Sequence, residues 1–221
     1  MFQGCTALVN FIVPDNVTLI GERAFQGCTN LKTLTFPASY KAETLSFGLT
    51  PFVSCPAFEG YVIEDGASIV RTEDGTLLAG GGKVLVSLPR DFKGTSYTVP
   101  DGVETISDYL FYKNTTITSV TLPASLKKIG TAAFQGCTKL TSIALPDGFT
   151  TLGEHAFDGC SGLKTVTFGQ SLTAVPAYAF SNCSALTAVD LPATVETVGD
   201  YAFRGCAKAT ALSLKEGLTS I

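Results

Sequence analysis

The chain has 221 residues, of which 45% are hydrophobic and only 15% charged, and its formal net charge is −4 at pH 7. This much apolar material excludes a disordered chain, and the lack of a basic excess argues against nucleic acid as a partner. No apolar run reaches the roughly 18 residues of a membrane span, so the chain is not expected to span a membrane, and its first residues lack a signal peptide's basic start.

A phenylalanine in segments related to AFQGC recurs every 23 residues, from Phe2 to Phe25 and again from Phe111 to Phe203. A cysteine, or in one case an asparagine, follows each of these phenylalanines, and also Phe52, by three residues. We call these residues the cysteine ladder: Cys5, Cys28, Cys55, Asn114, Cys137, Cys160, Cys183 and Cys206. A unit of 23 residues is too short to bury its own apolar side. The sequence therefore predicts stacked coils, each of which covers the next.

Each coil continues with the pattern L-x-x-φ-x-φ-P, in which φ is apolar. This alternation predicts a strand with one buried face, which the proline ends. The predicted strands begin near residues 8, 31, 58, 94, 117, 140, 163, 186 and 209, and the one near 94 is weak because Gly94 replaces a leucine. A second short extended stretch follows, as at Val17 and Ile20. Gly-x-x-Ala-Phe then predicts one helical or 3-10 turn, whose glycine permits a tight bend, at Gly21, Gly130, Gly153 and Gly199.

The middle of the chain departs from this spacing. The coil from Cys28 to Cys55 has 27 residues, and the segment from Cys55 to Asn114 contains 36 residues more than one coil. We expect a β-hairpin insertion at residues 64–93 within a single domain that spans residues 1–221. Its exposed polar side chains are expected to be Arg71, Glu73, Asp74 and Lys83.

Three segments of this insertion invite a ligand-binding interpretation that we do not favour. Glu64-Asp65-Gly66 and Glu73-Asp74-Gly75 lack the alternating acidic ligands of a calcium loop, and we interpret them as turns. Gly80-Gly81-Gly82-Lys83 lacks the spacing of a phosphate loop, and we interpret it as a flexible hairpin turn.

The cysteines of the ladder are interpreted as reduced, structural residues. A thiol there is a small apolar filler, and a buried Asn114 would bond the turning backbone of neighbouring coils. Disulfides between adjacent coils are the alternative, but an odd number of side chains that point the same way disfavours them. One cysteine per 23 residues and a single histidine do not match a zinc site. We expect no metal or cofactor.

The unit LTSIALPDGFTTLGEHAFDGC closely resembles the BspA-like leucine-rich repeats of bacterial and protist surface proteins. The segment YVIEDGASIVRTEDGTLLAGGGKVLVSLPRDFKGTSYTVP resembles the segment that interrupts repeats in that family. With the repeat, the resemblance predicts an α/β repeat solenoid, namely a right-handed leucine-rich repeat with 23-residue coils and a parallel β-sheet on one face. It also implies display on a cell surface, a link to adhesion, and no catalytic motif.

The chain begins inside a coil and ends before the next predicted turn. We therefore expect an excised or truncated segment of a longer exported protein, whose exposed end strands allow end-to-end self-association.

Catalysis has little support in the sequence. His155 is the only histidine, and other coils have Arg23, Ala132, Tyr178 and Tyr201 at its position, so we expect it to be exposed and solvated. Without a nucleophile motif beside it, we expect no enzyme activity. Sequons at Asn16, Asn114 and Asn182 matter only in a eukaryotic secreted protein, and a buried Asn114 would be a poor acceptor.

The outward positions of the predicted strands are the best candidate surface. We call them the strand stripe: Thr33, Thr35, Ser119, Thr121, Ser142, Ala144, Thr165, Thr167, Ala188, Asp190, Ala211 and Ser213. Threonine also simply suits a half-exposed strand, whereas the functional interpretation is a broad docking face. An irregular T-x-T pattern disfavours ice binding.

The first function hypothesis is an extracellular or cell-surface binding module with adhesin-like recognition of host or microbial protein or glycan. The alternative is a structural spacer of a larger surface protein that binds nothing itself.

Overall fold

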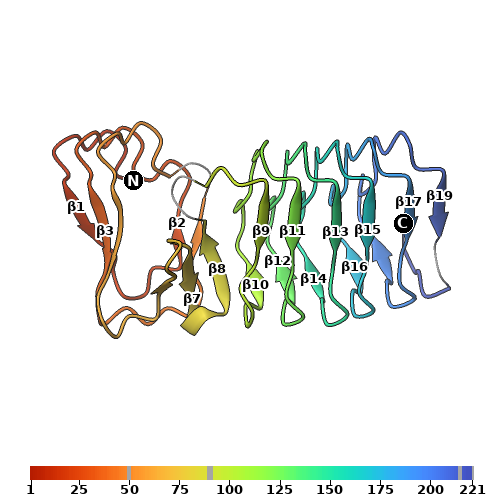
Figure 1. Ribbon diagram of the computed structural model, residues 1–221, viewed down its shortest axis with the longest axis horizontal. Coiled ribbons are helices and arrows are strands. Elements are labelled where there is room, and N and C mark those ends of the chain that lie inside the picture. The colour runs from red at the N-terminus through yellow and green to blue at the C-terminus, as the bar shows by residue number, and fades with distance from the viewer. Residues whose placement is uncertain (49–50, 89–91, 214–215, 221) are drawn as a thin grey trace. The chain divides into compact units, whose positions relative to one another are not determined.

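A computed structural model gives the fold and describes residues 1–48, 51–88, 92–213 and 216–220. Contacts divide the chain into two compact units, Met1–Phe92 and Lys93–Ile221 (Figure 1). Each unit is a parallel β-solenoid, in which main strands alternate with shorter return strands. The solenoid fold that the repeat predicts is thus confirmed, whereas the expectation of a single domain stays a prediction.

In the first unit the main strands form one parallel sheet in the order β1, β3, β5, and the return strands β2 and β4 form another. A further antiparallel set, β6–β7–β8, lies within the segment expected to be a hairpin insertion. The bounds are β1 Asn10–Ile12, β2 Leu19–Ile20, β3 Thr33–Phe36, β4 Ser46–Phe47, β5 Gly60–Ile63, β6 Val70–Arg71, β7 Leu77–Ala79 and β8 Val84–Ser87. The 3-10 helix η1, Gly80–Gly82, joins β7 to β8 and is the only helix among the described residues.

In the second unit, β9, β11, β13 and β15 form a parallel sheet, and β17 pairs with β19. The main strands are β9 Ser96–Thr98, β11 Ser119–Thr121, β13 Ser142–Ala144, β15 Thr165–Thr167, β17 Ala188–Asp190 and β19 Ala211–Ser213. The return strands are β10 Thr105–Ile106, β12 Lys128–Ile129, β14 Thr151–Leu152, β16 Ala174–Val175 and β18 Thr197–Val198. All nine predicted main strands are therefore present, including the weak one after Gly94, and each begins two residues after its predicted start.

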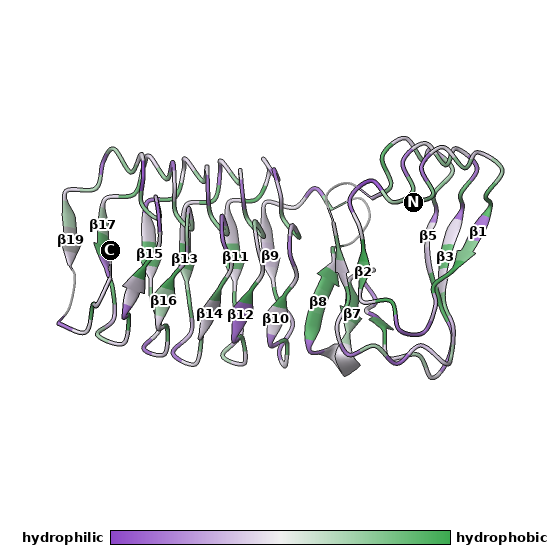
Figure 2. Cartoon of the chain, turned by 180° about the vertical axis from the view of Figure 1, so that it is seen from behind, coloured by the Kyte–Doolittle hydropathy of each residue, from purple (hydrophilic) through white to green (hydrophobic). Residues whose placement is uncertain are grey.

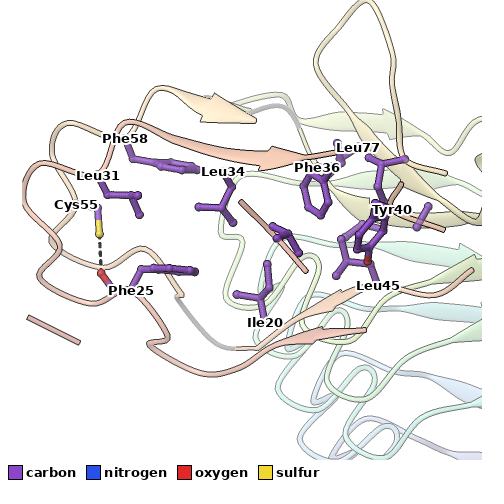
Figure 3. Packing of buried hydrophobic residues seen from close by; sticks show 14 of the residues in the cluster. Ile20, Phe25, Leu31, Leu34, Phe36, Tyr40, Leu45, Cys55, Phe58 and Leu77 are labelled. Atoms are coloured by element: carbon purple, nitrogen blue, oxygen red, sulfur yellow. Dashed lines mark hydrogen bonds between the residues drawn. The ribbon is translucent and has the colours of Figure 1, made fainter. Parts of the chain in front are cut away.

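Stacked phenylalanine rings fill the interior of each unit. In the second unit the rings from Phe111 to Phe203 lie 4.7–5.4 Å apart between consecutive centres and are nearly parallel. In the first unit Phe2, Phe25 and Phe52 stack in the same way, at 5.4 and 5.6 Å. Aliphatic side chains surround these rings, as Figure 3 shows for the first unit. Each ring packs against the ring of the next coil, so a single coil could not bury its own ring.

The cysteine ladder runs beside the phenylalanine stack and bonds consecutive coils together. Each thiol except that of Cys5 donates to a phenylalanine carbonyl oxygen of the preceding coil, 26 residues before it in the regular coils and 30 residues before it at Cys55 (Figure 3). The Sγ to oxygen distances are 2.9 Å for Cys28 and Cys55, 3.0 Å for Cys137 and Cys160, 3.2 Å for Cys183 and 3.3 Å for Cys206. All seven cysteines are free thiols, and Cys5 is exposed.

Asn114 does not behave as the sequence predicts. It is half-buried, and its Oδ1 accepts hydrogen bonds from the backbone of Thr116 and Ile117 at 2.9 and 3.0 Å. A short amide reaches its own turn more readily than the next coil. The expectation of a buried asparagine that bonds neighbouring coils is therefore wrong.

The segments with the pattern Gly-x-x-Ala-Phe are hydrogen-bonded turns, not helices. In each, the second residue after the glycine position has a left-handed backbone, with φ between 51° and 58° at Arg23, Tyr109, Ala132, His155, Tyr178 and Tyr201. A left-handed residue in every turn interrupts helical hydrogen bonding.

The glycines before these turns are needed for a different reason from the expected tight bend. Gly130, Gly153 and Gly199 do not have a positive φ, but a Cβ on Gly153 would lie 2.4 Å from the carbonyl carbon of Gly130 in the preceding coil. At Gly130, Gly153 and Gly199 the backbone of the preceding coil thus lies too close for a side chain, whereas a Cβ on Gly21 would meet nothing within 4 Å.

Candidate functional site

The strand stripe is exposed in the second unit. Ser119, Thr121, Ser142, Thr165 and Thr167 are all exposed, as are the alanines of the stripe and Asp190, whereas Ser213 is half-buried. The registers of β11, β13 and β15 align Ser119 with Ser142 and Ser142 with Thr165, so these hydroxyls form a column across the sheet. In Figure 2, β11 and β13 include pale, weakly polar parts, whereas β12 is part hydrophilic (purple) and part hydrophobic (green).

A neighbouring column of threonines has a different role. Thr118, Thr141, Thr187 and Thr210 precede the strands, and each Oγ1 donates to a backbone carbonyl oxygen of the preceding coil at 2.8–3.4 Å. In the part of the chain that the structure describes, no hydrogen bond within the chain engages the hydroxyls of Ser119, Thr121, Ser142, Thr165 or Thr167. The stripe therefore keeps its hydroxyls available to a partner, whereas the adjacent column stabilises the solenoid.

Sequence reasoning missed two residues of this surface. Ser96 and Thr98 on β9 are exposed and lie in register with Ser119 and Thr121. They were not assigned to the stripe because Gly94 weakens the strand signal. The signal that finds them is the 23-residue spacing itself, counted back from Ser119 and Thr121.

In the first unit the stripe is less accessible. Thr33 and Thr35 on β3 are half-buried, and the hydroxyl of Thr33 donates to Oδ1 of Asn10 at 2.8 Å. The strand order places Thr35 between the exposed side chains of Ile12 and Val62. The stripe of this unit is thus more apolar than that of the second unit.

The insertion presents its polar side chains as expected, since Arg71, Glu73, Asp74 and Lys83 are exposed. The carboxylate of Asp74 accepts hydrogen bonds from Thr72, from the backbone of Thr76 at 3.0 Å and from its hydroxyl at 3.1 Å. These bonds hold the pKa of Asp74 below its usual value, with the Thr72 hydroxyl as the largest cause. Asp74 therefore orders the β6–β7 turn and is poorly placed to bind a ligand.

The Gly80–Gly82 segment is a short 3-10 helix whose three glycines have positive φ. A Cβ on Gly80 would lie 2.3 Å from the carbonyl oxygen of Glu43, so close backbone packing, as well as turn geometry, requires glycine there.

His155 is half-buried, so it is only partly solvated and not fully exposed as the sequence predicts. Its ring stacks on Tyr178 with 4.6 Å between centres, and Tyr178 stacks on Tyr201 at 5.1 Å. Nδ1 of His155 lies 3.3 Å from Oδ2 of Asp158. We call His155, Tyr178 and Tyr201 the aromatic edge. Variation among coils at this position was misleading because a histidine and a tyrosine both fit such a stack.

The described residues contain no group of three or more histidine, cysteine, aspartate or glutamate side chains arranged to hold a metal ion. His155, Asp158 and Tyr178 meet without a serine or cysteine nucleophile among the contacts of the histidine.

No helix within the described ranges is both long and apolar enough to cross a membrane.

Repeated strands, a phenylalanine stack and a ladder residue at a fixed position of successive coils are typical of a leucine-rich repeat protein. Residues 1–69 and 104–221 match the BspA type leucine rich repeat region in six copies, and the chain belongs to this family.

Solved bacterial proteins share this fold. A leucine-rich repeat protein from Eubacterium ventriosum is 21% identical, with a TM-score of 0.65 over 95% of this chain and 73% of its own. The pneumococcal vaccine antigen PcpA is 20% identical, with a TM-score of 0.53 over 94% of this chain and 68% of its own. At these identities the likeness establishes the fold alone. Among curated proteins, none matches this chain.

Proposed function

We propose that this chain is a binding module of a cell-surface protein, and that it recognises a protein or glycan of a host or neighbouring microbial cell through the strand stripe. The observation that carries the proposal is the column formed by Ser96, Ser119, Ser142 and Thr165, whose side chains are exposed and uncharged. Membership of the BspA type family and the likeness to a vaccine antigen support placement at the cell surface.

The chemistry of the stripe suits many weak contacts rather than one strong one. Hydroxyl groups donate and accept hydrogen bonds, and the threonine methyls and the alanines add small apolar contacts. Asp190 is the one charged side chain among the stripe residues, so a partner need not desolvate many charges. Many copies on one cell would raise the avidity of such contacts.

The test introduces two charges into the stripe. The double variant Thr165→Glu/Thr167→Glu should reduce binding to immobilised matrix proteins, glycans or whole microbial cells by about tenfold or more, because buried unpaired charges oppose association. The matched control is Thr151→Glu/Thr173→Glu, which adds the same charge at exposed positions outside the stripe. Circular dichroism and thermal unfolding verify that both variants fold.

A structural spacer is the second candidate, and the regular bonding between coils favours it. Thiols and threonine hydroxyls connect successive coils, as a stiff rod requires. Binding that survives the stripe variant, or equal loss in both variants, would contradict the stripe as the site. Absence of binding to every immobilised target would contradict the binding module and favour the spacer.

A further inference from the structure

The aromatic edge places large rings at backbone positions where they are costly. Residues His155, Tyr178 and Tyr201 have φ values of 56°, 57° and 58°. Side chains with a Cβ are disfavoured in this region, and glycine or asparagine is preferred. The other left-handed position, just before the ladder residue, is glycine in some coils and a residue with a side chain in others, such as Lys113 and Asn182. Three successive coils thus carry a ring at a backbone position that disfavours side chains.

These rings are also accessible from outside the solenoid. Tyr201 retains 56% of its surface, and Tyr178 and His155 are half-buried. Stacking between them occupies ring faces, so the edge presents ring rims, tyrosine hydroxyls and an imidazole. Recognition of a sugar uses a free ring face, whereas tyrosine rims and hydroxyls are common in contacts with proteins.

The exposed carboxylates beside the edge are those of Glu154 and Asp200. The carboxylate of Asp158 is half-buried and already accepts hydrogen bonds from Gln135 Nε2 at 2.9 Å and from Asn182 Nδ2 at 3.1 Å. The third turn also contains Arg204, whose guanidinium carbon lies 5.5 Å from the centre of the Tyr201 ring. The chain itself thus shows an arginine seated against this edge.

We propose that the aromatic edge, together with the exposed carboxylates of Glu154 and Asp200, is a second interaction surface, and that its partner is a protein segment rich in arginine or lysine. Guanidinium and ammonium groups of the partner pair with the carboxylates and donate hydrogen bonds to the tyrosine hydroxyls. The apolar part of the partner's side chains packs against the ring rims. This surface is separate from the strand stripe, so the two proposals stand or fall independently.

The probe is a 12-residue peptide of alternating arginine and serine, with an alternating glutamate and serine peptide as its counterpart. Titration of the isotopically labelled chain, followed by NMR, should shift amide signals around Glu154, Tyr178 and Tyr201 with the arginine peptide only. Affinity should fall as salt rises, because the charges are exposed. Shifts confined to other residues, or equal binding of both peptides, would overturn the proposal.

Two variants separate the rings from the charges. Tyr178→Asn/Tyr201→Asn removes the rings and keeps residues that tolerate a left-handed backbone, and it should weaken binding of the arginine peptide about tenfold. Glu154→Gln/Asp200→Asn should weaken it about fivefold at low salt. The control Asp147→Asn/Glu196→Gln removes two exposed carboxylates elsewhere in the unit and should leave affinity unchanged.

The stripe variant Thr165→Glu/Thr167→Glu distinguishes failure of one proposal from failure of the other. It should retain full affinity for the arginine peptide, whether or not the stripe binds a partner. Suppose that Asp147→Asn/Glu196→Gln lowers affinity for the arginine peptide as much as Glu154→Gln/Asp200→Asn does. Net charge alone would then explain the effect, which would contradict a specific surface.

Discussion

The thiol of Cys160 donates a hydrogen bond to the carbonyl oxygen of Phe134, at 3.0 Å and 26 residues earlier in the chain. Cys160 is completely buried, and its neighbours in the cysteine ladder are the buried Cys137 and Cys183. One small side chain thus fills the space beside the phenylalanine stack and connects two coils. This double role explains why a cysteine recurs with the period of the solenoid.

Replacement of Cys160 by alanine should lower the free energy of unfolding by about 1–2 kcal/mol, because it creates a cavity and removes a donor. Chemical denaturation under reducing conditions measures this change. Cys206→Ala, in the same unit, is the control, since Cys206 is only partly buried and its bond is longer at 3.3 Å. An effect at Cys206 as large as that at Cys160 would contradict this account.

Stability should also fall at alkaline pH, because burial raises the pKa of Cys160 and Cys183 well above the usual range of a thiol. Above about pH 9 the unfolded chain loses thiol protons that the folded protein keeps. The stabilising contribution is therefore complete below that pH and declines as pH rises, by about 1.4 kcal/mol per pH unit for each protected thiol. Tyr40 and Tyr61, whose pKa burial raises to about 12, extend the decline above pH 10.

Denaturation at pH 7, 9 and 10 in the presence of a reductant tests this expectation. The double variant Cys160→Ala/Cys183→Ala should show a shallower decline between pH 9 and 10 than the parent chain. A free energy of unfolding that is equal at all three pH values would show that these thiols ionise as easily in the folded protein.

Close approach of neighbouring coils makes Gly153 irreplaceable. Gly153→Ala would place a Cβ 2.4 Å from the carbonyl carbon of Gly130, and the coils must separate to relieve this contact. We expect a loss of about 3 kcal/mol or more, or failure to fold. In Gly148→Ala the new Cβ meets nothing nearer than 4.0 Å, so that variant should stay within about 1 kcal/mol of the parent. Thermal unfolding of both variants gives the comparison, and a stable Gly153→Ala protein would contradict it.

Much of the fold was predictable because it depends on features that repeat in one dimension. The interval between Phe134 and Phe157 gives the coil length, and alternation around Ile143 gives the strand and its buried face. Features that depend on contacts between coils were not predictable. The requirement for glycine at Gly153 arises from the distance to the next backbone, which no local pattern records.

The candidate surfaces show the same division. Outward positions such as Ser142 follow from strand alternation. The sequence does not reveal how the neighbouring hydroxyls of Thr141 and Ser142 differ. The hydroxyl of Thr141 donates a hydrogen bond to the preceding coil, whereas that of Ser142 is exposed and makes no hydrogen bond within the described chain. The stacking of His155 on Tyr178 joins residues 23 positions apart through a left-handed turn, so it appears only when the coils are placed side by side.

Replacement of Lys113 by glycine should stabilise the protein, in contrast to the replacement of Gly153 by alanine. It has a φ of 55° at the position before the ladder residue, where Gly136, Gly159 and Gly205 have values of 72–75°. Lys113→Gly removes the steric cost of the left-handed conformation, partly offset by the greater freedom of glycine in the unfolded chain and by the lost contact of the ammonium with the Tyr112 ring at 5.1 Å. We expect a net gain of about 0.5–1 kcal/mol in the free energy of unfolding.

The control is Lys139→Gly, at an exposed residue without a positive φ, which should lose about 0.5–1 kcal/mol. Equal destabilisation by both substitutions, measured by denaturation, would mean that the backbone at Lys113 bears no strain.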